Sequence, residues 1–196
     1  MKYVKMLGLA AVAAMALTAF LGASSASATV LCKTSSTPCG AAWIKTGTLS
    51  ASLASGATSV LKTTNGAIVD TCSESTIGGT IERQGAGQSV AGTVSQLTFT
   101  TCTNTTSVLS QDGILEIEGT TVKAKGFEVT VNAGVSCVIS AGEGTILGTF
   151  TGGNPAIIHV NAVVNKTSGS FLCPFDYQWE ATYQITGVGT LHSEPE

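Results

Sequence analysis

Residues 177–186, Tyr-Gln-Trp-Glu-Ala-Thr-Tyr-Gln-Ile-Thr, decide the fold. Apolar or aromatic side chains occupy every second position, and Gln, Glu or Thr occupy the positions between them. Neighbouring side chains of a β-strand point to opposite faces, so this stretch predicts a strand with one buried face and one solvent-facing side. The same alternation recurs in residues 49–53, 97–99, 127–132 and 157–164. The pattern therefore predicts a protein built from such strands.

The chain after residue 28 favours strands and turns over helices. Apolar residues do not recur there at helical spacing, and threonine, which suits a half-buried pleated surface, is frequent. Asn65-Gly66 is typical of a type I′ hairpin turn, and Asp112-Gly113 and residues 152–155, Gly-Gly-Asn-Pro, also predict turns. About ten to twelve short strands separated by turns predict an all-β fold, an antiparallel β-sandwich or a barrel-like domain.

Residues 1–28 have the three parts of a secretory signal peptide. Two lysines supply a positive start, residues 6–21 are uncharged and mostly apolar, and Ala26-Ser27-Ala28 offers small residues for cleavage. A membrane-spanning helix needs roughly 20 apolar residues, so an uncleaved anchor is the weaker alternative. We expect a bacterial protein that is exported to the medium or the cell surface, with no transmembrane segment after cleavage.

Residues 29–196 form the predicted mature protein, and their length suits one domain. Two packed β modules with a boundary near residue 110 are the alternative, because four cysteines precede that point and two follow it. The mature part has a formal net charge of −5, and Arg83 is its only arginine. Nucleic-acid binding requires a basic surface that neutralises phosphates, so nucleic acid is not an expected partner. An anionic membrane surface is an equally poor partner.

Six cysteines in an exported protein predict three disulfides. They are Cys32, Cys39, Cys72, Cys102, Cys137 and Cys173. Structural zinc sites favour Cys-x-x-Cys pairs, which this spacing lacks. Six cysteines allow fifteen connectivities, and the sequence does not decide among them. We favour sequential pairing, in which Cys32 joins Cys39, Cys72 joins Cys102 and Cys137 joins Cys173.

Two landmarks carry a resemblance to other proteins. They are residues 97–102, Leu-Thr-Phe-Thr-Thr-Cys, and the combination of Cys173-Pro174 with residues 179–183, Trp-Glu-Ala-Thr-Tyr. Over most of the mature part, the chain resembles uncharacterised secreted, Thr/Gly-rich, disulfide-containing β proteins of high-GC Gram-positive bacteria. The resemblance implies secretion and a β fold, and it implies no activity.

Glu116 and Glu118 are the sharpest candidates for catalysis. Residues two apart lie on the same face of a strand, about 7 Å apart, which is within the range that glycosidases use for an acid/base pair. The simpler interpretation is a solvated strand face with Leu115 and Ile117 turned inward. With Asp112, the same carboxylates could also supply oxygen ligands for calcium, although no dense Asp/Asn-Gly loop is present. We therefore predict no catalytic residue, no metal and no cofactor.

A Ser-His-Asp triad would have to use His159 or His192, the two histidines of the chain. No Gly-x-Ser-x-Gly motif accompanies them. His159 lies in one of the alternating stretches, so we interpret it as a half-exposed strand residue.

Trp179 and Tyr177, together with Glu116 and Glu118, are the candidates for ligand binding. Exposed aromatic rings on one strand face could form a platform on which sugar rings stack. Tyr177 and Trp179 also have the spacing of side chains that pack together into a core. Burial in the core is the default interpretation of these two residues. Exposure of Trp179 would favour the carbohydrate hypothesis.

The sequence thus predicts a secreted non-enzymatic β domain with a structural, adhesive or cell-surface role. Few titratable groups and long Thr/Ser/Gly-rich faces lead to this hypothesis. The alternative is a carbohydrate or cell-wall polymer binding module, and a small glycoside hydrolase using Glu116 and Glu118 comes third. A cell-surface glycan or a protein is the expected partner, and the sequence does not identify it.

Overall fold

The computed structural model describes residues 29–33, 47–85, 88–104, 106–186 and 191–195, and strands with their connecting turns make up this part of the chain. The predicted all-β, antiparallel, barrel-like fold is confirmed. The predicted signal peptide, residues 1–28, lies outside the described residues. Within them, the chain contains no helix that is long and apolar enough to cross a membrane.

One antiparallel sheet contains twelve strands of the described chain. These strands are β2 (Gly47–Leu53), β3 (Ser59–Thr63), β4 (Ile68–Gly85), β5 (Gln88–Cys102), β6 (Thr106–Gln111), β7 (Gly113–Glu118), β8 (Thr121–Lys125), β9 (Phe127–Asn132), β10 (Ser136–Ala141), β11 (Thr145–Thr151), β12 (Ile157–Gly169) and β13 (Asp176–Thr186). A separate two-stranded ribbon pairs β1 (Thr29–Cys32) with β14 (His192–Pro195).

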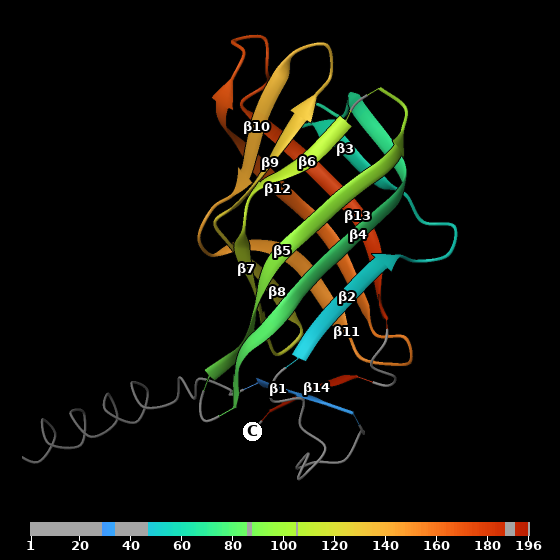
Figure 1. Ribbon diagram of the computed structural model, residues 1–196, viewed down its shortest axis with the longest axis vertical. Coiled ribbons are helices and arrows are strands. Elements are labelled where there is room, and N and C mark those ends of the chain that lie inside the picture. Colours follow the sequence, from blue (N-terminus) through green and yellow to red (C-terminus); the bar gives the residue numbers. More distant parts are fainter. Residues whose placement is uncertain (1–28, 34–46, 86–87, 105, 187–190, 196) are drawn as a thin grey trace, which may run out of the picture.

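The twelve strands form an eight-stranded closed barrel (Figure 1). The long strands β4, β5, β12 and β13 run along its whole length, and both of β13's edges are paired. The other four positions of the cylinder are each filled by two short strands in line: β2 with β3, β6 with β7, β9 with β8, and β10 with β11. Strand positions that follow one another along the chain are also adjacent in the barrel, so the chain runs up and down around the cylinder.

The barrel has two different ends. The β1–β14 ribbon lies across the lower end in Figure 1, where Leu31 and Leu191 are fully buried. The upper end carries the turns that connect β3 to β4, β5 to β6, β9 to β10 and β12 to β13. Strands from both sides of residue 110 belong to the same closed cylinder.

The side chains that the alternation predicts to be buried face the interior of the barrel. Tyr177, Trp179, Ala181, Tyr183 and Ile185 of β13 are all buried in the barrel, and the residues between them are partly solvent-facing. The alternating residues of β9 and β12 behave in the same way. Period-two patterning thus separated interior from exterior correctly in the strands that line the core.

The turn predictions had mixed outcomes. Asn65-Gly66 does form a hairpin, but only Gly66 has positive φ (90°), so the turn is not type I′. The N–H of Gly66 donates to the carbonyl of Thr63 (2.8 Å), which closes a four-residue turn. The prediction of a turn at Asp112-Gly113 was wrong, because β6 and β7 continue in the same direction on either side of Asp112. Residues 152–155 do connect β11 to β12.

Two of the favoured disulfides are confirmed. Cys72 of β4 is bonded to Cys102 of β5, and Cys137 of β10 is bonded to Cys173 in the turn after β12. Each bridge closes a segment of about 30–40 residues, which in the chain-entropy account stabilises by about 3–4 kcal/mol. The favoured pairing of Cys32 with Cys39 involves a residue outside the described part of the chain.

Gly79 of β4 lies directly against the backbone of β5, and it provides a test of this strand pairing. A Cβ on Gly79 would lie 1.8 Å from the backbone oxygen of Thr93 in β5, whereas a Cβ on Gly142 would meet nothing closer than 3.9 Å. We expect Gly79→Ala to lower the free energy of unfolding by about 3 kcal/mol or more, because the strands must separate locally. Gly142→Ala is the matched control and should change it little. Equal stability of the two variants in urea denaturation would contradict this strand pairing.

Candidate functional site

Both candidate carboxylates belong to β7, where Glu118 is exposed and Glu116 is buried, only 9% exposed, so the expected solvated strand face holds for Glu118 alone. Glu116 Oε1 is 3.3 Å from Lys125 Nζ, and Glu118 forms an ion pair with Lys123, both lysines being on the neighbouring β8. The hydrogen bond and the charge of Glu118 raise the pKa of Lys123. Each carboxylate therefore has a lysine partner, which is the arrangement of an ion-paired strand face.

The aromatic candidates lie inside the barrel. Tyr177 is 2% exposed and Trp179 is 6% exposed, so neither offers a ring on the outer surface. The Trp179 ring makes edge-to-face contacts with Phe99 of β5, Phe127 of β9 and Tyr183 of β13, with ring centroids 6.1–6.4 Å apart. Offset and edge contacts of this kind stabilise aromatic pairs beyond their burial. Trp179 is thus a packing centre that connects opposite walls.

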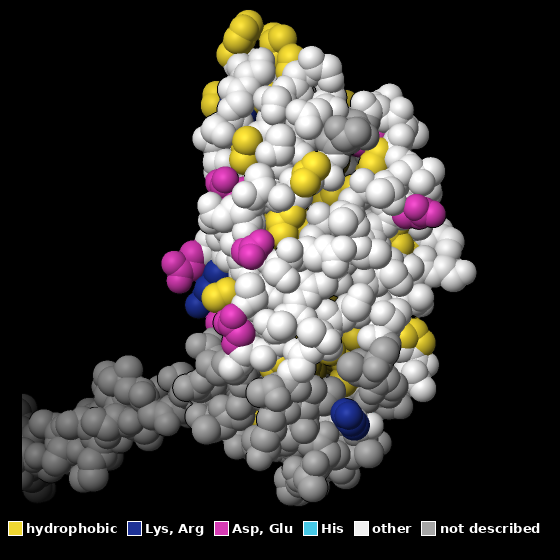
Figure 2. Space-filling model, in the orientation of Figure 1, with side chains coloured by type: hydrophobic (Ala, Val, Ile, Leu, Met, Phe, Trp, Pro, Cys, Tyr) yellow, Lys and Arg dark blue, Asp and Glu magenta, His cyan; other side chains and the backbone are white. Residues whose placement is uncertain are grey.

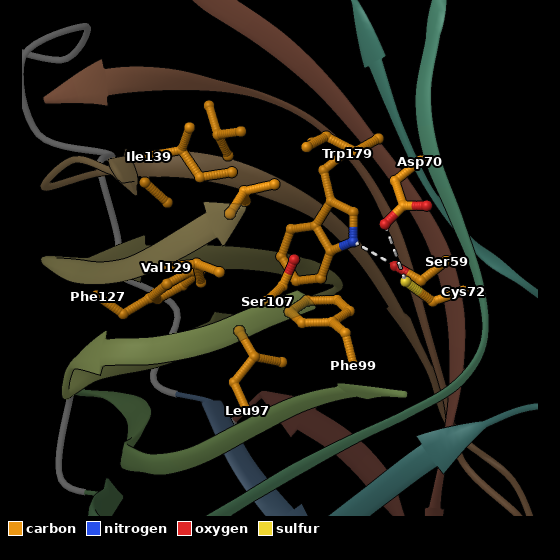
Figure 3. A pocket seen from close by; sticks show the side chains of 14 residues that line it. Ser59, Asp70, Cys72, Leu97, Phe99, Ser107, Phe127, Val129, Ile139 and Trp179 are labelled. Carbon is orange, nitrogen blue, oxygen red and sulfur yellow. Dashed lines mark hydrogen bonds between the residues drawn. The ribbon is translucent and has the colours of Figure 1, made fainter. Parts of the chain in front are cut away.

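A cavity of about 40 Å³ lies beside Trp179 in the upper half of the barrel (Figure 3). Its apolar wall includes Leu97, Phe99, Val129 and Ile139, and its polar wall consists of Ser59, Asp70 and Ser107. Figure 3 shows Ser59, Asp70 and Cys72 on one side of the indole ring and the apolar residues of β9 and β10 on the other. A buried water needs roughly 10–15 Å³, so the cavity has room for a few waters.

Two of the polar side chains around this cavity, Ser59 and Asp70, are hydrogen-bonded to other protein groups. Trp179 Nε1 donates to Ser59 Oγ (2.9 Å). Asp70 Oδ1 accepts from the backbone N–H groups of Thr71 and Asn104 (2.9 and 3.0 Å) and from the hydroxyl of Thr103 (2.9 Å). The Asp70 carboxylate therefore fastens the turn between β5 and β6 to β4.

A second polar pair lies near these residues. The Tyr183 hydroxyl and Ser75 Oγ are 2.8 Å apart, and both side chains are buried. Burial raises the pKa of Tyr183 to about 12, an effect that hydrogen bonds from Ser75 and Ser59 partly offset. Burial also raises the pKa of Tyr177. The interior thus holds both tyrosines in the neutral form.

The only cluster of potential metal ligands among the described residues is Asp70 with Cys72 and Cys102. The two sulfurs form a disulfide with each other. A cysteine binds a metal as the thiolate, which a disulfide sulfur is not. The cluster therefore does not fit a metal ion while the disulfide is intact.

Two further cavities lie deeper in the barrel, of about 80 Å³ and about 10 Å³. Apolar residues and the glycines Gly78, Gly79 and Gly92 line the larger one, and Leu31 of the β1–β14 ribbon contributes to its lower wall. Pockets for small organic ligands typically measure about 300–1,000 Å³. The interior is thus a packed core with small voids, and a binding surface has to be sought outside it.

One loop exposes large apolar side chains. The tip loop, Ser170–Phe175 (Ser-Phe-Leu-Cys-Pro-Phe), joins β12 to β13 at the top of Figure 1. Phe171, Leu172 and Phe175 are 89%, 64% and 78% exposed. Contiguous exposed apolar groups of this kind mark interaction surfaces more often than single exposed residues do.

The tip loop is held in place by the wall beneath it. Cys173 is buried and bonded to Cys137 of β10, so its side chain points inward while its neighbours point outward. The N–H of Ser170 donates to the carbonyl of Ser136 (3.0 Å), and the N–H of Cys173 donates to the carbonyl of Ser170 (3.1 Å). The ammonium of Lys166 lies 3.1 Å from that same carbonyl and 5.2 Å from the centre of the Phe175 ring.

The turns around the tip loop carry no charge. Residues 64–67 (Thr-Asn-Gly-Ala), 103–104 (Thr-Asn) and 133–135 (Ala-Gly-Val) contain no acidic or basic residue, and neither does the tip loop. Ile68, which follows the first of these turns, is 63% exposed. Figure 2 shows hydrophobic side chains at this end and acidic side chains on the wall below it. The upper end is therefore an uncharged surface with an apolar summit, formed by the exposed side chains of Phe171, Leu172 and Phe175.

Sequence reasoning missed the tip loop. Its signal is three large apolar residues around Cys-Pro, between two strand patterns, where polar turn residues are the usual choice. His159, by contrast, lies on the outer wall of β12 as interpreted, with Nδ1 3.2 Å from the Thr182 hydroxyl.

Comparison of the chain with models of protein families, with curated proteins and with solved structures found no match. The candidate site therefore rests on the geometry of the described residues.

The buried tyrosines make the barrel sensitive to alkali. An unfolded tyrosine ionises near pH 10, whereas folded Tyr183 has a pKa of about 12 and keeps its proton up to that pH. The folded state thus binds more protons between these values, so stability falls as pH rises from about 10 to about 12, by about 3 kcal/mol in total from Tyr183. In protein that starts at Thr29, Tyr177 and Tyr183 are the only tyrosines, and phenolate absorbance should appear only as the protein unfolds.

The variant Tyr183→Phe is the control, because it should show a smaller loss of stability over this pH range. A phenolate signal with a midpoint near the ordinary tyrosine pKa, about 10, in protein whose far-ultraviolet circular dichroism is still native would contradict the burial of both rings.

Proposed function

We propose that this protein is an extracellular, non-enzymatic β-barrel domain with an adhesive role, which attaches to a cell surface through its upper end. The observation that carries the proposal is the tip loop, where Phe171, Leu172 and Phe175 are exposed on a segment that a disulfide holds to the barrel. The disulfides Cys72–Cys102 and Cys137–Cys173 are compatible with an oxidising compartment outside the cytoplasm.

The energy available at the tip loop suits attachment. Removing one Phe or Leu side chain from water contributes about 1.5–3 kcal/mol, so three such side chains offer about 5–9 kcal/mol before the costs of association. The loop is already held by the disulfide of Cys173 and by the hydrogen bond from the Ser170 N–H to the Ser136 carbonyl, so little conformational entropy is lost on binding. A rigid apolar summit can therefore bind without further folding.

The other hypotheses have less support from the geometry. A hydrolase that uses Glu116 and Glu118 would need two carboxylates free to act, and both are paired with lysines of β8. A glycan-binding module cannot use Trp179 or Tyr177 as an outer platform, because both are inside the barrel. It would have to use aromatic rings of the tip loop, which makes a wall polymer the second candidate for the same loop.

The test compares a tip variant and a wall control for binding to intact cells of the organism that carries the gene. In the tip variant, Phe171, Leu172 and Phe175 are each replaced by Ser. In the wall control, Ile146 and Val163, which are exposed on the barrel wall at 60% and 45%, are replaced by Ser. We expect the tip variant to bind at least about a hundredfold more weakly, and the wall control to bind like the wild type, with unchanged melting temperatures.

Equal binding of the tip variant and the wild type would disprove the proposal, as would the absence of any binding of the wild type to those cells.

A further inference from the structure

We propose that the surface bound by the tip loop is the interfacial region of a lipid layer with zwitterionic headgroups. This inference rests on the proposed function and names the partner of the same loop. Four features support it: the shape of the upper end, the hydrogen bonds of the loop backbone, the two charges at the base of the loop and the overall charge of the chain.

The shape of the upper end suits a deformable partner surface. The tip loop lies at the upper end of the barrel in Figure 1, its Phe171, Leu172 and Phe175 are exposed, and Ile68 is exposed beside a neighbouring turn. A projecting apolar summit needs either a matching concave pocket or a soft surface into which it can sink. Phe and Leu side chains enter the boundary between lipid headgroups and acyl chains by about 5–10 Å, and that boundary needs no preformed pocket.

Most backbone N–H groups of the tip loop have hydrogen-bond partners within the protein, which suits insertion into lipid. An N–H group without a partner is costly in lipid. The N–H groups of Ser170 and Cys173 donate to backbone carbonyls, and that of Leu172 donates to the Ser170 hydroxyl (3.2 Å). Pro174 has no N–H group. Four of the six loop positions therefore present no N–H group without a partner, which lowers the cost of inserting the loop.

Two opposite charges lie at the base of the loop. Lys166 on β12 places its ammonium next to the Ser170 carbonyl, and its long apolar stem can follow the loop towards the headgroups. Asp176, the first residue of β13, accepts a hydrogen bond from Asn165 (2.7 Å). One cation and one anion below an uncharged summit complement the phosphate and the quaternary ammonium of a zwitterionic headgroup.

The overall charge argues for zwitterionic lipids over anionic ones. The chain from residue 29 has a formal net charge of −5, and the turns of the upper end contain no basic residue. Attraction to anionic lipids requires clustered lysines or arginines near the surface. Lys166 alone does not provide such a cluster, so added anionic lipid should weaken binding.

The experiment places a fluorescent reporter in the loop. Phe171→Trp adds an indole at the summit, and Ile146→Trp adds one on the exposed wall as the matched control. Each purified protein is titrated with phosphatidylcholine vesicles, and the emission is compared with that of the parent, whose own tryptophans supply the background. We expect a blue shift and quenching by brominated phosphatidylcholine for Phe171→Trp, and neither effect for Ile146→Trp.

Vesicle flotation supplies the affinities. Phe171→Ser should lower the partition coefficient about tenfold or more, and the three-serine tip variant about a hundredfold or more. Vesicles of phosphatidylglycerol should bind the wild type more weakly than phosphatidylcholine at low salt.

The outcomes separate this inference from the proposed function. If the tip loop is needed for binding to cells but the Phe171→Trp variant gives no shift with phosphatidylcholine, the lipid inference fails and a wall polymer or a protein is the partner. If phosphatidylglycerol binds more tightly than phosphatidylcholine, the inferred headgroup class is wrong. If cell binding does not depend on the tip loop, both proposals fail.

Discussion

The closure of the sheet between β13 and the pair β2 and β3 is the constraint on which the rest of the structure depends. Once these strands pair, the cylinder has no free edge, and each wall side chain points either into a space of fixed width or to solvent. The ion pair between Lys62 of β3 and Glu180 of β13 (2.6 Å) crosses the same seam on the outside. Inside, Trp179 fills the middle of the space and touches rings from both β5 and β9.

A filled and closed cylinder leaves its ends as the places for function. The β1–β14 ribbon covers the lower end, where Leu31 of β1 and Leu191, just before β14, are buried, whereas the upper end carries the turns. There, the bond between Cys137 and Cys173 sets the orientation of the tip loop, because turning Cys173 inward turns its apolar neighbours outward. The same closure that excludes a large interior ligand thus supports an exposed apolar summit.

Much of the wall could be predicted from the sequence, because alternation depends only on neighbours along the chain. It placed Trp179 and Tyr183 on one face, and that face is the interior. The number of strand positions around the barrel, eight, could not be predicted from the sequence. Asp112 and Gly126 interrupt strands that continue in the same direction, and in the sequence such an interruption resembles a turn. The lysine partners of Glu116 and Glu118 depend on the register with β8, which alternation does not provide. The exposure of Phe171 depends on where the partner of Cys173 lies, and only the folded chain determines that.

Hydrogen exchange followed by mass spectrometry on the free, oxidised protein tests the closed barrel most directly. The account predicts that peptides from β2 and β3 exchange as slowly as peptides from β12, because both are held by strands on either side. Rapid exchange of β2 and β3, with β12 still protected, would mean an open sheet with free edges. The filled interior and the assignment of function to the upper end would then lose their basis.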